Sequence, residues 1–290
     1  MRDRFSMYHP VCGFLFFIVA AVVSMVLFHP LFLSVSFLCA LTYLLVLRGR
    51  KAFGLLLKFL LPMAAVVTLI NALLNSYGTT VLFALPWGLP FTAEALLFGF
   101  CQALLFSSVL LWLFCYSDVM GSEKFLFVFG RIFPNTALLF SMTLRFIPLF
   151  VRRAGEIRMA RRAAGIAGQH RLKEAVHVFS ALATGCLESS VAMALSMRAK
   201  GYGAGQRRPF NRYRFKKKDA LYFLFLLFCL AAVAAGGMAD AYYFEFEPAL
   251  YLETGPLFYL GLGAFFAFCI SPVLLDAAEA VKWRILMSKI

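Results

Sequence analysis

The chain has 290 residues, of which 62% are hydrophobic, and it carries a formal net charge of +14. Phenylalanine alone contributes 34 residues, so the apolar content exceeds what the core of a soluble protein of this length needs. The composition therefore excludes an ordinary soluble domain and predicts an integral membrane protein. We expect no nucleic-acid partner, because attraction to anionic membrane lipids and the orientation of the spans already account for the positive charge.

The apolar segments predict an all-α, polytopic fold with about six transmembrane helices. Each segment is close to the roughly 20 residues that cross a bilayer as a helix. Backbone groups inside a bilayer must pair within the chain, so we expect these spans to be helical. The predicted spans are 11–28, 31–47, 53–75, 92–116, 219–236 and 256–274.

The distribution of Lys and Arg predicts the orientation of these spans. Three connections, 29–30, 76–91 and 237–255, contain neither residue. By the positive-inside rule these connections lie outside, and the cation-rich segments lie in the cytoplasm. We therefore expect a multi-pass protein of the cell (plasma) membrane with both termini cytoplasmic, which agrees with an even number of spans.

A drop in hydrophobicity in the middle of the chain predicts three segments. Residues 1–117 hold the N-terminal transmembrane helices, 118–218 form a cytoplasmic domain, and 219–290 hold the C-terminal transmembrane helices. In the middle segment the uniform apolar runs give way to helices with mixed faces, which is typical of amphipathic helices at a membrane surface. This is the segment where we expect function to lie.

Helix signals subdivide the cytoplasmic segment. We expect a short helix over 122–131, an interruption at Pro134, and a helix that resumes at Thr136 and continues toward Gly165. A second long helix is predicted from about Arg171 to Lys200, which at 1.5 Å per residue is roughly 45 Å long. A turn over 165–170 connects the two.

Both long helices are predicted to end in the same way, with cations and small residues before a glycine. The first end is Arg161-Arg162-Ala163-Ala164-Gly165, and the second is Arg198-Ala199-Lys200-Gly201. Cations and glycine are ordinary at helix C termini, so the pattern has a purely structural interpretation. The alternative is that the cations bind carboxylates on a partner. The residues alone leave both interpretations open.

Signals for catalysis are absent from the sequence. No G-x-x-x-x-G-K-[ST] phosphate loop exists, so the chain is not expected to hydrolyse ATP. The histidines and the singly placed cysteines form no convincing metal set, and the cysteines have the character of small buried hydrophobes. We therefore predict no catalytic residue, no metal site and no cofactor.

Four features in order resemble the transmembrane T component of energy-coupling factor (ECF) transporters, which are importers related to ABC transporters. The resemblance extends from about His9 through Phe210. The features are Leu144-Arg145-Phe146-Ile147-Pro148, Glu156-Ile157, Ala163-Ala164-Gly165 and Ala199-Lys200-Gly201-Tyr202.

The resemblance implies a non-catalytic scaffold for vitamin or transition-metal (cobalt, nickel) uptake. Its partners would be two cytosolic ABC-type ATPase subunits, which bind the ATP, and a small substrate-binding membrane subunit. In the family, Ala-Arg-Gly-like signatures at the ends of two coupling helices contact the ATPases. Here they correspond to Ala163, Ala164 and Gly165, and to Ala199, Lys200 and Gly201.

This chain departs from the family pattern at the middle position of each signature, which holds Ala164 in the first and Lys200 in the second where arginine is usual. Lysine keeps the charge but lacks the planar fork of a guanidinium. We therefore predict that the electrostatic anchors for the ATPases are Arg161, Arg162, Arg198 and Lys200.

Two other functions are compatible with the composition. A membrane-embedded enzyme acting on lipid phosphates would use the basic face to hold phosphate groups. A solitary permease would carry polar groups near the bilayer midplane, for which the candidates are Asn71, Asn75, Gln102, Ser107 and Ser108.

Overall fold

The computed structural model describes residues 5, 8–75, 80–84, 90–130, 133–166, 171–203, 213, 215–239, 242, 244–245, 251–252 and 255–287. The chain forms two compact units. The first combines residues 1–121 with 213–290, and the second is 122–212. The first unit is thus built from both ends of the chain.

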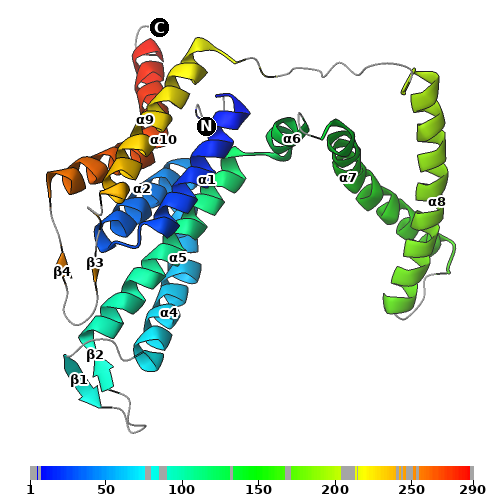
Figure 1. The fold of residues 1–290 in the computed structure, drawn as a ribbon. Helices are drawn as coiled ribbons and strands as arrows, with labels where there is room; N and C mark the ends of the chain where they lie inside the picture. The colour runs from blue at the N-terminus through cyan, green and yellow to red at the C-terminus, as the bar shows by residue number, and fades with distance from the viewer. Residues whose placement is uncertain are drawn as a thin grey trace. The chain divides into compact units, whose positions relative to one another are not determined.

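The first unit is a bundle of long apolar helices (Figure 1). It contains α1 (Pro10–Val26), α2 (Pro30–Arg48), α5 (Ala93–Val119), α9 (Lys217–Met238) and α10 (Pro256–Met287). A further helix starts as α3 (Arg50–Leu55) and passes through a π-helical turn, Leu56–Leu60, into α4 (Leu61–Leu74). The all-α fold is confirmed, and α1, α2 and α10 each begin at a proline, the residue favoured in the first turn.

Two short antiparallel hairpins interrupt the helical pattern. β1 (Val81–Ala84) pairs with β2 (Pro90–Thr92) between α4 and α5. β3 (Phe244–Glu245) pairs with β4 (Tyr251–Leu252) between α9 and α10. Both lie in connections that contain no Lys or Arg, for which the sequence indicated only loops.

Six of the described helices are long and apolar enough to cross a membrane. They are α2, the continuous helix Arg50–Leu74, α5, α8 (Arg171–Ala199), α9 and α10. The number of such helices agrees with the prediction, but the observed set and the predicted set differ by one helix. Helix α1, a predicted span, has 17 residues and is shorter than the other six, whereas α8 was expected in the cytoplasmic segment. The architecture is that of a multi-pass membrane protein.

A chain of buried polar side chains joins three helices at the centre of the bundle. Trp112 of α5 is 1% exposed, and its Nε1 donates to Ser36 Oγ of α2 over 3.0 Å. Ser36 Oγ is in turn 2.7 Å from Ser24 Oγ of α1. Hydrogen bonds between helices fix which faces meet where the surroundings are otherwise apolar. Here they fix α1, α2 and α5 around Trp112.

Glycines allow close helix contacts at two other places. A Cβ on Gly99 of α5 would lie 2.9 Å from the Thr68 carbonyl oxygen, so α4 and α5 approach more closely than larger residues would allow. The Tyr242 ring fills the space that Cβ atoms on Gly236 of α9 and Gly261 of α10 would need. Its hydroxyl donates to the Val233 carbonyl over 3.0 Å. Tyr242 thereby packs against both α9 and α10 and stabilises their contact.

One buried carboxylate accepts hydrogen bonds at the N termini of two helices. Asp219, which is 5% exposed, accepts from the Lys216 backbone N–H over 2.8 Å at the start of α9. Its other oxygen accepts from the His9 N–H over 3.2 Å, one residue before α1 begins. Negative charge is favourable at helix N termini, so a single side chain stabilises both.

The second unit consists of α6 (Ser122–Gly130), α7 (Pro134–Ala163) and α8. The predicted helix 171–200 is confirmed, with α8 ending at Ala199. Pro134 begins α7 instead of interrupting a helix, because proline needs no N–H partner in the first turn. Of the side chains described between 122 and 203, only Val178 is fully buried, at 4% exposed.

Candidate functional site

The end of α7 closes in a Schellman motif. Gly165 has a φ of 71°, the left-handed conformation that favours glycine. The Ile166 N–H donates to the Arg161 carbonyl, and the Gly165 N–H donates to the Arg162 carbonyl, each over 3.1 Å. These two bonds satisfy carbonyls that the helix leaves unpaired and stop it at this glycine.

The end of α8 repeats this geometry bond by bond. Gly201 has a φ of 86°, and its N–H donates to the Arg198 carbonyl over 3.0 Å. The Tyr202 N–H donates to the Met197 carbonyl, also over 3.0 Å. Both predicted helix ends are therefore formed, and their backbones correspond position by position from the glycine backwards.

Most of the predicted partner-binding residues are exposed at these ends. On α7 these are Arg162, Ala163, Ala164 and Gly165, and on α8 they are Arg198, Ala199, Lys200 and Gly201. Small residues let another surface approach the backbone, and exposed cations beside a helix C terminus are suited to carboxylates on that surface. Each end thus has the physical properties of a docking point for an acidic surface.

Arg161 differs from the other predicted anchors because its side chain is engaged inside the second unit. Its Nε donates to Glu174 Oε1 over 3.0 Å, and its Nη2 donates to Glu174 Oε2 over 3.1 Å. The hydrogen bond to Glu174 raises the pKa of the Arg161 guanidinium, which stays charged. Glu174 lies in the first turn of α8, so the ion pair joins the end of one helix to the start of the next.

A second polar contact marks where α7 and α8 meet. Arg153 Nη1 donates to Ser189 Oγ over 2.9 Å, and Ser189 Oγ donates to the Gly185 carbonyl over 2.6 Å. Each helix continues for about ten residues, roughly 15 Å, beyond this contact before its C-terminal end. The two ends lie apart in Figure 1. The predicted turn between the helices includes 167–170, which lie outside the described residues.

An open groove of about 520 Å³ runs beside the same contact. It is lined by both helices and carries one cation, Arg153, with two carboxylates, Glu156 and Glu188. Sequence reasoning missed this groove, because its two walls are about 30 residues apart along the chain. Its charges are mixed, so it is a poorer site for a polyanion than the exposed helix ends.

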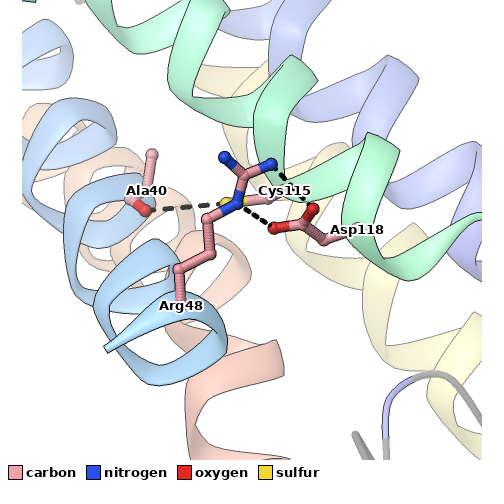
Figure 2. A network of polar contacts seen from close by, with 4 residues as sticks. All are labelled: Ala40, Arg48, Cys115 and Asp118. Atoms are coloured by element: carbon pink, nitrogen blue, oxygen red, sulfur yellow. Dashed lines mark hydrogen bonds and ion pairs between the residues drawn. The ribbon is translucent and has the colours of Figure 1, made fainter. Parts of the chain in front are cut away.

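The bundle carries an ion pair between the end of α2 and the last turn of α5 (Figure 2). Arg48, the last residue of α2, donates from Nη2 to Asp118 Oδ1 over 2.7 Å and from Nε to Oδ2 over 2.5 Å. Cys115, one turn earlier, donates from Sγ to the Ala40 carbonyl over 3.8 Å. These contacts fix the last turn of α5 against α2, two residues before Met120 leaves the helix.

The described residues contain no group of three His, Cys, Asp or Glu side chains that could hold a metal ion. Of the seven cysteines, six are buried in the bundle as free thiols, and Cys186 on α8 is half-buried. Comparison with known protein families and with characterised proteins gives no match for this chain.

Proposed function

We propose that this chain is the transmembrane T component of an ECF-type importer, located in the cell membrane. As a scaffold, it would join two cytosolic ABC-type ATPase subunits to a small membrane subunit that captures a vitamin or a transition-metal ion. The chain itself catalyses no reaction and binds no cofactor, because ATP is bound by the partners. Closure of the ATPase pair moves the two helix ends, and the bundle passes this motion to the capture subunit.

The observation that carries the proposal is the repeated geometry of the two helix ends. A single cationic helix end is ordinary, but here two helices stop in the same backbone motif with an arginine three residues before the glycine. Two similar docking points suit two similar partner subunits. The two ends lie apart (Figure 1), so each can serve one subunit.

The proposal also places α8 along the cytosolic face of the membrane, with both chain termini in the cytoplasm. Lys173 lies near the start of α8 and Arg198 near its end, so a crossing α8 would put cations on both sides, against the positive-inside rule. Glu174 and Glu188 on the same helix would be costly inside a bilayer. These charges favour a surface position although α8 is apolar enough to span.

The orientation of α8 can be measured by cysteine labelling. Lys173→Cys and Lys200→Cys are made separately in a Cys186→Ser background, so that the half-buried native thiol does not react. Both new thiols should react with a membrane-impermeant maleimide only when the cytosolic face is accessible, in inverted vesicles. Reaction of the two from opposite sides would show that α8 crosses the membrane and would overturn this placement.

The function itself is tested by affinity purification of the chain from mild detergent. Mass spectrometry identifies the proteins that co-purify, and ATP hydrolysis is measured on the complex. Recovery of ATP-binding-cassette subunits with a small membrane protein supports the scaffold, and that protein identifies the substrate class. Recovery of the chain alone, with transport by the pure protein in liposomes or turnover of a lipid phosphate, contradicts it.

A further inference from the structure

The two adjacent arginines at the end of α7 have different surroundings. The Arg161 side chain is 23% exposed and forms a two-bond fork with Glu174, whose side chain is 15% exposed. Arg162 is exposed. Successive residues of a helix differ by about 100° in direction, so the two guanidinium groups leave α7 on different sides.

Arg161 is also bonded to the turn that follows its own helix. Its Nη2 lies 3.4 Å from the Ile166 carbonyl oxygen, to which it donates, and its own carbonyl accepts from the Ile166 N–H over 3.1 Å. A carboxylate from a partner would have to displace Glu174 from two charge-assisted hydrogen bonds before it could use Arg161. The Arg161 side chain therefore stabilises the turn after α7 and the start of α8.

Aligning the two helix ends on their glycines shows a second difference between Arg161 and Arg162. Arg162 and Arg198 occupy the same position, since each carbonyl accepts the N–H of the terminating glycine. Arg161 corresponds to Met197, which carries no charge and whose carbonyl makes the equivalent bond to Tyr202. The cation that the two ends share is thus Arg162 in one and Arg198 in the other.

We infer that Arg161 is a positioning residue, which acts through Glu174 to hold the first docking end in place, and that Arg162 is the cation this end presents to its ATPase. This assignment rests on the proposed function. It changes the prediction for one of the four anchors: Arg161 contributes by orienting the α7 end, and Arg162 and Arg198 contact acidic groups on the partners directly.

The test compares the affinity of purified variants for the ATPase subunits that co-purify with the wild-type chain. Arg162→Ala and Arg198→Ala should each weaken binding about tenfold, because each removes a direct charge contact. Arg161→Ala and Glu174→Ala should each weaken it by a smaller and similar factor of about threefold. The reversed pair Arg161→Glu with Glu174→Arg should restore wild-type affinity, because the ion pair forms again in the opposite sense.

Two outcomes would overturn the inference. If the reversed pair binds as weakly as Arg162→Ala, Arg161 meets the partner directly. If Arg162→Ala has no effect while Arg161→Ala abolishes binding, the roles are the opposite of those assigned. In both cases the wild-type chain still binds ATPases and the proposed function stands, whereas a wild-type chain that recovers no ATPase subunit overturns the function and the inference together.

Discussion

The bundle and the α6–α8 unit both contain large apolar side chains, but they use them differently. In the bundle, large side chains such as Phe16, Tyr43 and Trp112 are fully buried against one another. In the α6–α8 unit only Val178 is fully buried among the described side chains, and α7 and α8 are joined through Arg153–Ser189 and Arg161–Glu174. The bundle therefore supplies its own core, whereas the second unit buries little apolar surface within itself.

The exposed apolar residues of α8 illustrate this contrast. Leu172, Phe179 and Leu187 are 83%, 71% and 70% exposed, on a helix that also carries charged groups at both ends. A surface of this kind is stable in water only when a membrane or a partner covers it. The difference between the units leads to a separation of roles: substitutions in the bundle core should change stability, and substitutions at the helix ends should change docking.

The largest expected effect is on the stability of the bundle. Trp112→Ala removes a fully buried ring and its hydrogen bond to Ser36, and large-to-small changes of this kind cost about 3–5 kcal/mol. The thermal unfolding midpoint in detergent should fall strongly. Leu113→Ala, at the adjacent position that is 52% exposed, should leave the midpoint almost unchanged. A milder variant, Trp112→Phe, keeps a ring, so its unfolding midpoint should lie between those of Trp112→Ala and Leu113→Ala.

Next in size is the effect of reversing charge at the end of α8. Arg198→Glu with Lys200→Glu should weaken ATPase binding at least tenfold, about 1.4 kcal/mol, because like charges then face each other. The thermal midpoint should stay at the wild-type value, since both residues are exposed. Arg50→Glu with Lys51→Glu, which changes an exposed Arg–Lys pair at the start of α3 by the same charge, is the matched control and should bind normally. Equal loss of binding in both would mean that net charge, not position, controls docking.

A smaller effect is expected from the glycine that ends α8. Gly201→Ala forces a side chain into the left-handed region at a cost of about 1–2 kcal/mol, so the last turn should loosen and ATPase affinity should drop a few-fold. Gly155→Ala is the control, because Gly155 lies inside α7 and a Cβ added to it would have no heavy atom of another group within 4 Å. In a helix interior alanine is favoured over glycine by about 0.5–1 kcal/mol, so this variant should bind normally and gain stability.

The smallest effect concerns the ion pair of Figure 2. Arg48→Ala should lower the stability of the bundle by about 1 kcal/mol or less, because the two side chains are 31% and 28% exposed. ATPase binding by the full chain should not change. The exchanged pair Arg48→Asp with Asp118→Arg should recover the lost stability. A change in binding without a change in midpoint would show that the separation between the two units is incomplete.

Local signals in the sequence predicted most of the helices. Prolines and glycines marked the start of α2 near Pro30 and the ends of α7 and α8 at Gly165 and Gly201, because these residues act on backbone geometry within one turn. It was harder to predict which helices are long and apolar enough to span a membrane. Helix α1 and helix α8 lie near the limits of length and apolar content, where composition alone does not decide.

The pairing of side chains could not be predicted in the same way. Arg161 and Glu174 are 13 positions apart, and Arg48 and Asp118 are 70 apart, so no helical or strand period relates them. In the sequence Arg161 and Arg162 are equivalent cations at a helix end. Only the fold distinguishes them, because it brings a carboxylate from the next helix to one and leaves the other exposed.

The shared carboxylate of Asp219 has a consequence for biosynthesis. The oxygen that accepts from the His9 N–H belongs to a residue 210 positions later in the chain, so His9 leaves the ribosome well before its partner. At about 5–20 residues per second, this partner arrives roughly 10–40 s after the start of α1 has been made. Helix α1 therefore gains this hydrogen bond at its N terminus only when α9 is synthesised, and the bundle is complete only once α9 and α10 have been made.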